Sequence, residues 1–159
     1  DMALYPVAGC KIYIGGVLSD KNADFVESDF SGQSWTEIDG WSQMGAVGDA
    51  AQTITTELIN RGRDVKQKGT ANAGTMENVF AIVPGDAGQT ALRAAAAPSN
   101  KNNCPFRIDL NDANGGAPSK RYFVALAMSQ QEAGGSANTI QNLNATLEIN
   151  SNIVRVAAT

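Results

Sequence analysis

The sequence predicts a mainly β fold: a two-sheet β-sandwich or barrel with one short flanking α-helix at about residues 86–97. Three observations support this prediction. Residues 142–150 alternate strictly between polar and apolar side chains, which is the pattern of a strand with one face on a core and the other toward water. About seven strand-like stretches occur along a chain whose length is typical of one domain, so we expect a single domain over residues 1–159. One segment is rich in alanine and therefore favours a helix, with strands before and after it.

The N-terminal part is expected to hold a short strand and a long loop. Residues 9–17 place Ile12 and Ile14 on one face and Lys11 on the other, as in a half-buried strand. Residues 18–34 are polar and aperiodic and contain glycine, which indicates a loop.

Two tryptophans and a further strand follow this loop. Trp35 and Trp41 are six positions apart and would lie on one side of an extended chain, where core packing explains them. Residues 51–74 are β-prone at first, then basic and punctuated by glycine. Residues 75–84 have the composition of another strand.

The predicted helix has recognisable ends. Asp86 can cap its first turn while Gln89, three residues later, reaches back to the cap, and Pro98 ends the alanine run. Its apolar face would consist of small or aliphatic side chains lying against a sheet: Ala87, Ala91, Leu92 and Ala95.

The C-terminal third is expected to be entirely β. Residues 105–112 alternate cleanly, and residues 121–129 are apolar on both faces, which indicates a central strand. Residues 139–156 would span about 60 Å if fully extended, which is too long for one strand of a domain this size. We therefore expect a break near Ser151 and Asn152, where the alternation falters.

Positive charge is concentrated in one segment. Arg61, Arg63, Lys66 and Lys68 are a third of the chain's 12 cations. A phosphate contact is one interpretation, but Asp64 interrupts the run. The segment also lacks the interleaved aromatic residues on which the bases of a single strand would stack. The other interpretation is a solvated loop or hairpin that meets another protein surface.

The composition gives no support to catalysis. The chain has no histidine, the commonest general base and metal ligand, and no G-x-S-x-G motif. Its 16 acidic residues are scattered, and the helix start lacks the lysine of a phosphate loop. We expect no catalytic residues, cofactor or metal, and the net charge of −4 points to no particular partner. Because no run of eighteen apolar residues occurs, we also expect no membrane insertion by this chain.

The two cysteines, Cys10 and Cys104, are too few and too far apart in sequence for a zinc site. They form one disulfide if the protein reaches an oxidising compartment, or remain two reduced and partly buried thiols. The sequence alone leaves both states open.

Several segments, taken in order, resemble the major tail tube protein of long-tailed bacteriophages. They are SWTEIDGWSQMGAVGDAAQTITTELINRGRDVKQKGTANAGTMENVFAIVPGDAGQTALRAA, KRYFVALAMS and INSNIVRV. The resemblance covers most of the chain from Trp35 onward and rests on segment order, above all the strand ending at Pro84 that leads into the helix at Asp86. It implies a two-sheet β-sandwich flanked by a helix, a fold shared with type VI secretion tube proteins. It also implies a structural polymer of stacked hexameric rings that form a hollow tube.

The resemblance suggests a use for the polar side of the alternating strand. In tubes of this family, strands of six subunits form a continuous barrel around the passage for double-stranded DNA. The side chains expected to line this passage are Asn142, Asn144, Thr146, Glu148 and Asn150. A lining without lysine suits transport, because one inward lysine per subunit would place about six cations in each ring, comparable to strong non-specific DNA binding.

The same resemblance places the basic segment between subunits. Arg61, Arg63, Lys66 and Lys68 are expected to meet carboxylates of a neighbouring subunit or ring. The implied partners are further copies of this chain, together with tape-measure and tail terminator or tip proteins. The implied location is the virion tail, assembled in the host bacterial cytoplasm.

Two other classes of protein stay open. One is an exported fimbrial or adhesin-type β-sandwich subunit in which Cys10 and Cys104 are joined. The other is a carbohydrate-binding sandwich, which an aromatic content of 6% and only two tryptophans disfavour.

Overall fold

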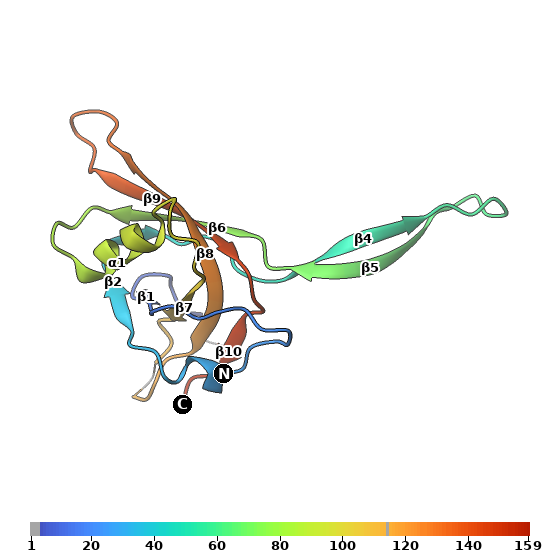
Figure 1. Ribbon diagram of the computed structural model, residues 1–159, viewed down its shortest axis with the longest axis horizontal. Helices are drawn as coiled ribbons and strands as arrows, with labels where there is room; N and C mark the ends of the chain where they lie inside the picture. Colours follow the sequence, from blue (N-terminus) through green and yellow to red (C-terminus); the bar gives the residue numbers. More distant parts are fainter. Residues whose placement is uncertain (1–3, 114) are drawn as a thin grey trace.

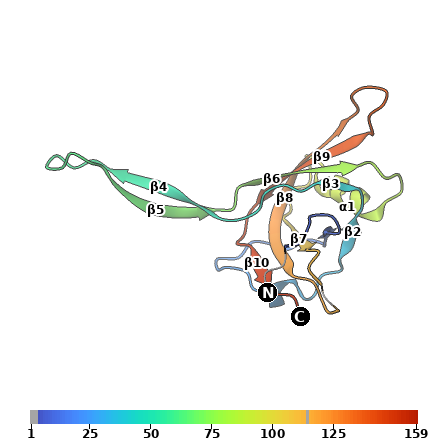
Figure 2. The same ribbon diagram turned by 180° about the vertical axis from the view of Figure 1, so that it is seen from behind.

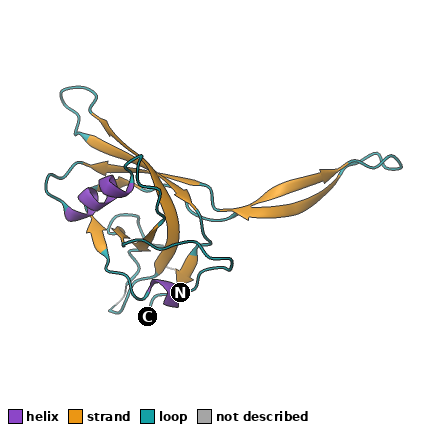
Figure 3. Ribbon diagram, in the orientation of Figure 1, coloured by secondary structure: helices purple, strands orange, loops and turns teal. Residues whose placement is uncertain are grey.

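The computed structural model describes residues 4–113 and 115–159, which form a large curved sheet, a projecting two-stranded hairpin and one α-helix (Figures 1 and 3). The mainly β fold with two sheets and one helix is therefore confirmed. The elements in chain order are β1 (Lys11–Ile14), the 3-10 helix η1 (Glu27–Phe30), β2 (Thr36–Ile38), β3 (Trp41–Gln43), β4 (Ala50–Thr56), β5 (Val65–Asn72), β6 (Thr75–Ala81), α1 (Ala87–Ala95), β7 (Cys104–Asp109), β8 (Lys120–Ala133), β9 (Asn142–Ile149) and β10 (Val154–Val156).

The large sheet has the strand order β2-β1-β7-β8-β9-β6-β3, with β10 paired to β8. It curves so far that β2 and β3, at opposite ends of this order, are separated in sequence only by Asp39 and Gly40. These two strands do not pair with each other, so the sheet approaches a barrel with one open seam. The turn between them places Gly40 at φ 81°, a conformation that favours glycine.

The central strand β8 is longer than expected and changes partners along its length. Its first half lies between β7 and β10, and its second half, from Ala125 to Ala133, pairs with β9. The register shifts between Ala127 and Ser129, so Met128 is 57% exposed at a bulge. Such a bulge bends its strand, in agreement with the curved β8 ribbon in Figure 1.

The main core fills the inside of the curved sheet and is covered by α1. It includes all four apolar side chains of β9, as the alternation predicted. Phe106 and Phe123 stack at its centre with ring centroids 5.6 Å apart, and Leu92 packs into it from the helix. The expected break after β9 is also confirmed, because β9 ends at Ile149 and β10 begins at Val154.

A second cluster lies on the opposite face of the sheet, around Tyr122 and Val124 of β8. Residues 18–34, expected to be a loop, contain η1 and contribute Phe25 and Phe30 to this cluster. Asn152 anchors the segment, because its side chain accepts a hydrogen bond from Phe25 N at 2.7 Å and donates one to Phe25 O at 3.0 Å.

The two tryptophans lie in different clusters. Trp35 packs against Tyr122 on the outer side, and Trp41 stacks on Phe80 beside the main core. The expectation that they share one side is wrong, because the turn at Gly40 carries the chain from one edge of the sheet to the other.

The helix α1 confirms the predicted cap but not the predicted use of Gln89. The Asp86 carboxylate accepts a hydrogen bond from Gln89 N at 2.9 Å. The Gln89 side chain is buried and crosses the open seam of the sheet, where Nε2 donates to Asp39 O and Ala81 O, both at 2.8 Å. Its Oε1 accepts from Val83 N at 3.2 Å.

The buried face of α1 also differs from the expected set, which contained Ala87 and Ala91. Ala87 is exposed and Ala91 is half-buried, and the residues that face inward are Gly88, Gln89, Leu92 and Ala95. The helix is rotated in this way because Gly88 lies directly on β2, where an added Cβ would be 2.0 Å from Glu37 O.

Cys10 and Cys104 are both free thiols. The antiparallel register of β1 and β7 pairs Lys11 with Asp109 and Ile14 with Phe106, so the cysteines flank opposite ends of this strand pair. Six residues of strand correspond to about 20 Å, far beyond the reach of a disulfide. The disulfide-linked fimbrial alternative is therefore excluded within one chain. Burial raises the pKa of the Cys104 thiol, which keeps it protonated.

Candidate assembly surfaces

The polar side of β9 faces away from the main core, as the alternation predicted. Leu143, Ala145, Leu147 and Ile149 are buried on the other side. Asn144 and Asn150 are exposed, and Asn142, Thr146 and Glu148 are half-buried. Asn150, one residue beyond the end of β9, donates from Nδ2 to Asn103 Oδ1 at 2.9 Å.

The strands beside β9 extend this surface. The register places Thr75 and Leu126 on either side of Glu148, and Glu77 and Ser129 on either side of Thr146. We call polar face the polar side chains of the three strands on this side of the sheet. They are Thr75, Glu77, Ser129, Gln131, Asn142, Asn144, Thr146, Glu148 and Asn150.

Sequence reasoning missed the four members of the polar face outside the alternating stretch. A signal was present for Thr75 and Glu77, because both alternate with buried residues of β6. For Ser129 and Gln131 no local signal existed, since the bulge in β8 changes which residues face outward. The Thr75 hydroxyl donates a hydrogen bond to the Glu148 carboxylate, which holds two strands of the face together.

The charge of the polar face is negative. Glu77 and Glu148 carry carboxylates, and its nine described residues include no lysine or arginine. The four cations singled out in the sequence lie elsewhere, on the hairpin that projects away from the sheet in Figures 1 and 2. The structure thus separates the two predicted sets of residues.

An unpaired strand edge borders the polar face. β7 pairs with β8 only from Asp109 opposite Lys120 to Cys104 opposite Ala125. Residues 126–133 of β8 therefore have a strand neighbour, β9, on one side only within the described chain. Such an edge presents backbone N–H and C=O groups that can pair with another strand.

The hairpin of β4 and β5 stands clear of the rest of the molecule. Every residue of β4 is exposed, and of β5 only Val65 and Gly69 are half-buried. The register puts Lys66 opposite Thr55 and Lys68 opposite Thr53, so the two lysines share one face.

The other hairpin face is more apolar, and the tip is basic and apolar at once. Ile54 and Val65 lie on the face opposite the lysines, with Ile54 48% exposed. The tip contains Arg61 and Arg63 together with the exposed Leu58 and Ile59, and closes with a hydrogen bond from Arg61 N to Leu58 O at 3.2 Å. The segment expected to be a solvated loop or hairpin is a hairpin, and its contact with another protein surface stays a prediction.

The hairpin and the remaining chain have opposite net charges. Residues 50–72 carry four cations and the two acidic residues Glu57 and Asp64, a net charge of +2. The remaining residues carry eight cations and 14 acidic residues, a net charge of −6. The opposite net charges of the two parts favour contact of a hairpin with another copy's body over contact between two hairpins or two bodies.

Chemical sites of other kinds were also sought. Among residues 4–113 and 115–159, no group of three or more acidic or cysteine side chains is arranged to hold a metal ion. Within the same ranges, no helix has the length and apolar character that a membrane crossing demands.

Comparison with known proteins relates this architecture to tube components. No protein-family profile and no curated protein sequence matches the chain. Among solved structures, it is similar to the sheath/tube terminator of the extracellular contractile injection system PVC, with a TM-score of 0.68, 16% identity, and coverage of 98% of this chain and 99% of that chain. The SPP1 tail tube gives a TM-score of 0.66 at 15% identity, covering 96% of this chain and 80% of that chain. A chain of the PVC sheath-tube complex gives 0.65 at 14% identity, with 97% and 92% covered. The protein thus has the fold of these tail tube and tube terminator structures.

Proposed function

We propose that this chain is a structural subunit, a single tail-tube domain over residues 1–159, that assembles with copies of itself into stacked hexameric rings. The rings form a hollow tail tube through which DNA passes to a host. The observation that carries the proposal is the polar face on one side of a curved sheet whose other side is a closed apolar core. This is the composition that a water-filled passage requires of its wall.

The charge of the polar face supports the passage of DNA. Asn142, Asn144, Thr146, Glu148 and Asn150 line the passage, joined by Glu77 from β6. In a hexameric ring the two carboxylates of each subunit give about twelve negative charges, which repel phosphates rather than retain them. DNA therefore finds no cationic contacts along this wall.

Ring closure uses the unpaired edge of β8. Residues 126–133 offer backbone donors and acceptors beside the polar face, and a strand of a neighbouring subunit satisfies them by strand addition. This extends the polar face from one subunit to the next, so that the wall is continuous.

Ring stacking uses the hairpin. An isolated two-stranded hairpin is marginally stable in water, and this one exposes Ile54, Leu58 and Ile59. Contact with a neighbouring ring buries these side chains and brings Arg61, Arg63, Lys66 and Lys68 to carboxylates of another subunit. The tube further binds tape-measure and tail terminator or tip proteins, and it resides in the virion tail after assembly in the host bacterial cytoplasm.

Electron microscopy of the concentrated purified protein tests this function. We expect rings and tubes from the native chain, and we expect rings at most from a variant in which residues 53–68 are replaced by a short glycine-serine turn. Persistent monomers of the native chain, also with tail components added, contradict the proposal.

The similarity to a tube terminator supports a second candidate, a subunit whose ring ends a tube. The same micrographs separate the two functions. A tube subunit elongates into tubes on its own, whereas a terminator stops at single rings and binds only to the end of a preformed tube.

A further inference from the structure

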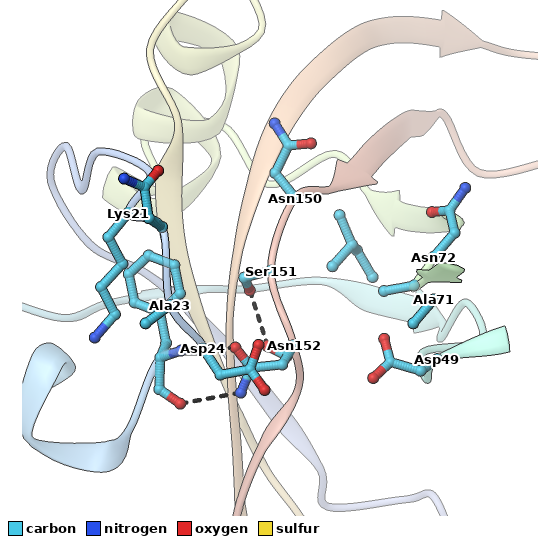
Figure 4. Close-up of a pocket in the computed structure, with 13 residues that line it drawn as sticks. Lys21, Ala23, Asp24, Asp49, Ala71, Asn72, Asn150, Ser151 and Asn152 are labelled. Atoms are coloured by element: carbon cyan, nitrogen blue, oxygen red, sulfur yellow. Dashed lines mark hydrogen bonds between the residues drawn. The ribbon is translucent and has the colours of Figure 1, made fainter. Parts of the chain in front are cut away.

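An open cavity of about 420 Å³ lies where the hairpin joins the body of the molecule (Figure 4). Its walls come from three separate segments: residues 21–25, the hairpin base with Asp49 and 71–73, and the end of β9 with the chain after it, residues 149–152. Asn152 fixes the first wall to the third through its two hydrogen bonds to Phe25. The cavity is therefore built on anchored segments.

The charge available in this cavity is negative. Lys21 lines it, but its Nζ is 2.6 Å from Asp29 Oδ2, an ion pair that also lowers the pKa of Asp29. Asp24 and Asp49 line the walls as well, and neither is in an ion pair with any described residue. In Figure 4 their carboxylates lie on opposite sides of the cavity.

The hairpin tip offers the complementary charge at the other end of the same element. Arg61 and Arg63 are exposed and have no ion-pair partner among the described residues. A guanidinium group presents five N–H donors and pairs well with carboxylates. The tip of one chain cannot reach the cavity of the same chain, because the hairpin extends away from it (Figure 1).

We propose that the cavity at the hairpin base receives the hairpin tip of the next copy of this chain, with Arg61 and Arg63 set between Asp24 and Asp49. The proposal rests on the proposed function and names the contact that stacks the rings. Residues 50–61 span roughly 40 Å at about 3.3 Å per residue. A displacement of one hairpin length along the hairpin axis therefore carries the tip of one copy to the base of its neighbour.

This contact is head-to-tail. Each copy uses its tip once and its cavity once. A head-to-tail contact closes into a ring only when it includes a closing rotation, whereas a displacement along the hairpin axis repeats without limit in one direction. The arrangement thereby supplies the polarity and open-ended growth of a tube from a single contact.

The test uses two full-length variants with opposite charge reversals. The tip variant carries Arg61→Glu and Arg63→Glu, and the cavity variant carries Asp24→Arg and Asp49→Arg. In a pure sample of either variant, tip and cavity have the same sign of charge, and we expect stacked rings to fall about tenfold or more relative to the native chain. When preformed rings of the two variants are mixed in equal amounts, a ring can stack on a ring of the other variant with tip and cavity of opposite sign, so we expect tubes of alternating rings to return.

Two controls separate this contact from other effects of charge. Glu37→Arg reverses one exposed carboxylate on β2, outside both the cavity and the hairpin, and we expect it to stack as the native chain does. Urea unfolding of each variant below its assembly concentration verifies that it folds. Recovery in the mixture but not in either pure variant supports the proposal, because misfolding or general repulsion does not produce it.

The results that would overturn the contact between tip and cavity can be distinguished from those that would overturn the tube function. If the native chain forms tubes while folded variants stack as well as it does, or while the mixture fails to recover, the tip does not occupy the cavity and the tube function stands. If titrated Ca²⁺ binds at Asp24 and Asp49 and the native tubes are unchanged by it, the cavity is a cation site and not a receptor for the tip. If the native chain forms no tubes, both proposals fail.

Discussion

Replacing Gln89 by methionine is expected to destabilise the fold strongly, although the two side chains have similar volumes. Gln89 is 2% exposed and its amide makes three hydrogen bonds to backbone groups: Asp39 O, Ala81 O and Val83 N. These groups lie at the open seam of the large sheet: Asp39 is in the turn between β2 and β3, Ala81 ends β6, and Val83 follows β6. Methionine keeps the packing but leaves all three groups without this partner.

The magnitude follows from the number of groups involved. A buried backbone donor or acceptor left without a partner costs about 1–3 kcal/mol. Ala81 N remains bonded to Gly40 O at 2.6 Å, which keeps the turn partly in place, and water reaches the seam from the exposed Asp39 side. We therefore expect the free energy of unfolding to fall by about 3–5 kcal/mol rather than by the largest sum.

Urea unfolding below the assembly concentration measures this loss through the midpoint, with an unchanged slope if the transition stays two-state. Gln131→Met is the matched control, because Gln131 is exposed on the polar face and the same substitution should change the free energy by less than about 0.5 kcal/mol. A loss of less than about 1 kcal/mol for Gln89→Met, together with a native helix signal, would falsify the view that this side chain closes the seam.

Three further predictions concern the core, acid stability and the passage. Phe123→Ala removes a fully buried ring that stacks on Phe106, and calorimetry or urea unfolding should show a loss of about 3–5 kcal/mol. The side chain and then the backbone N–H of Ser119 donate hydrogen bonds to Asp112 and lower its pKa. Because the folded pKa is depressed, the stability this provides is present above the unfolded pKa and disappears as the pH falls below about 4. Asp112→Asn should accordingly lose less stability than the native chain between neutral pH and pH 3, and equal losses would contradict this assignment. Asn144→Lys should still give tubes but slow DNA ejection from assembled particles, with Asn144→Gln as the control; normal ejection kinetics of the lysine variant would remove Asn144 from the passage.

The local parts of the fold were accessible from the sequence because their signals are local. The two faces of β9 follow from its period of two, and Leu143 and Leu147 are buried while Asn144 is exposed. The cap at Asp86 depends only on a residue three positions away. The hairpin was predictable from its basic, glycine-punctuated sequence, although its projection from the body was not.

The misses share a physical cause, since each depends on contacts between elements far apart in the chain. The spacing of Gln89 from Asp86 suggested that its side chain caps the helix. Its side chain instead bonds three backbone groups at the seam of the sheet, which the spacing of residues along the chain does not indicate. Trp35 and Trp41 separate because a two-residue turn joins opposite edges of the sheet. Ser129 joins the polar face because a bulge shifts the register of β8.

The candidate surfaces, too, were predictable only where their signal is local in the sequence. The five positions from 142 to 150 were recognised because they alternate with core residues, whereas Glu77 requires the pairing of β6 with β9. The basic residues were recognised as a group because they are close in sequence. The acidic cavity was not, because Asp24 and Asp49 come from two loops that are separated by two strands. Pairing across space, and not composition, defines both surfaces.

The isolated chain leaves three kinds of group unsatisfied at once, and one geometry satisfies all of them. The edge of β8 has backbone groups without a strand on one side, the hairpin exposes Ile54, Leu58 and Ile59, and the tip cations lie far from the carboxylates of the cavity. In the proposed tube, a lateral neighbour would pair the strand edge, and an axial neighbour would bury the hairpin and meet its charge. Because the two directions use different surfaces, weakening one should leave the other intact: charge reversal at the tip should stop stacking without opening rings. The hairpin lacks a core of its own, and an isolated two-stranded hairpin is marginally stable. If the axial contact orders the hairpin, this order should rise with protein concentration, because a partner that binds only the folded state stabilises that state by mass action.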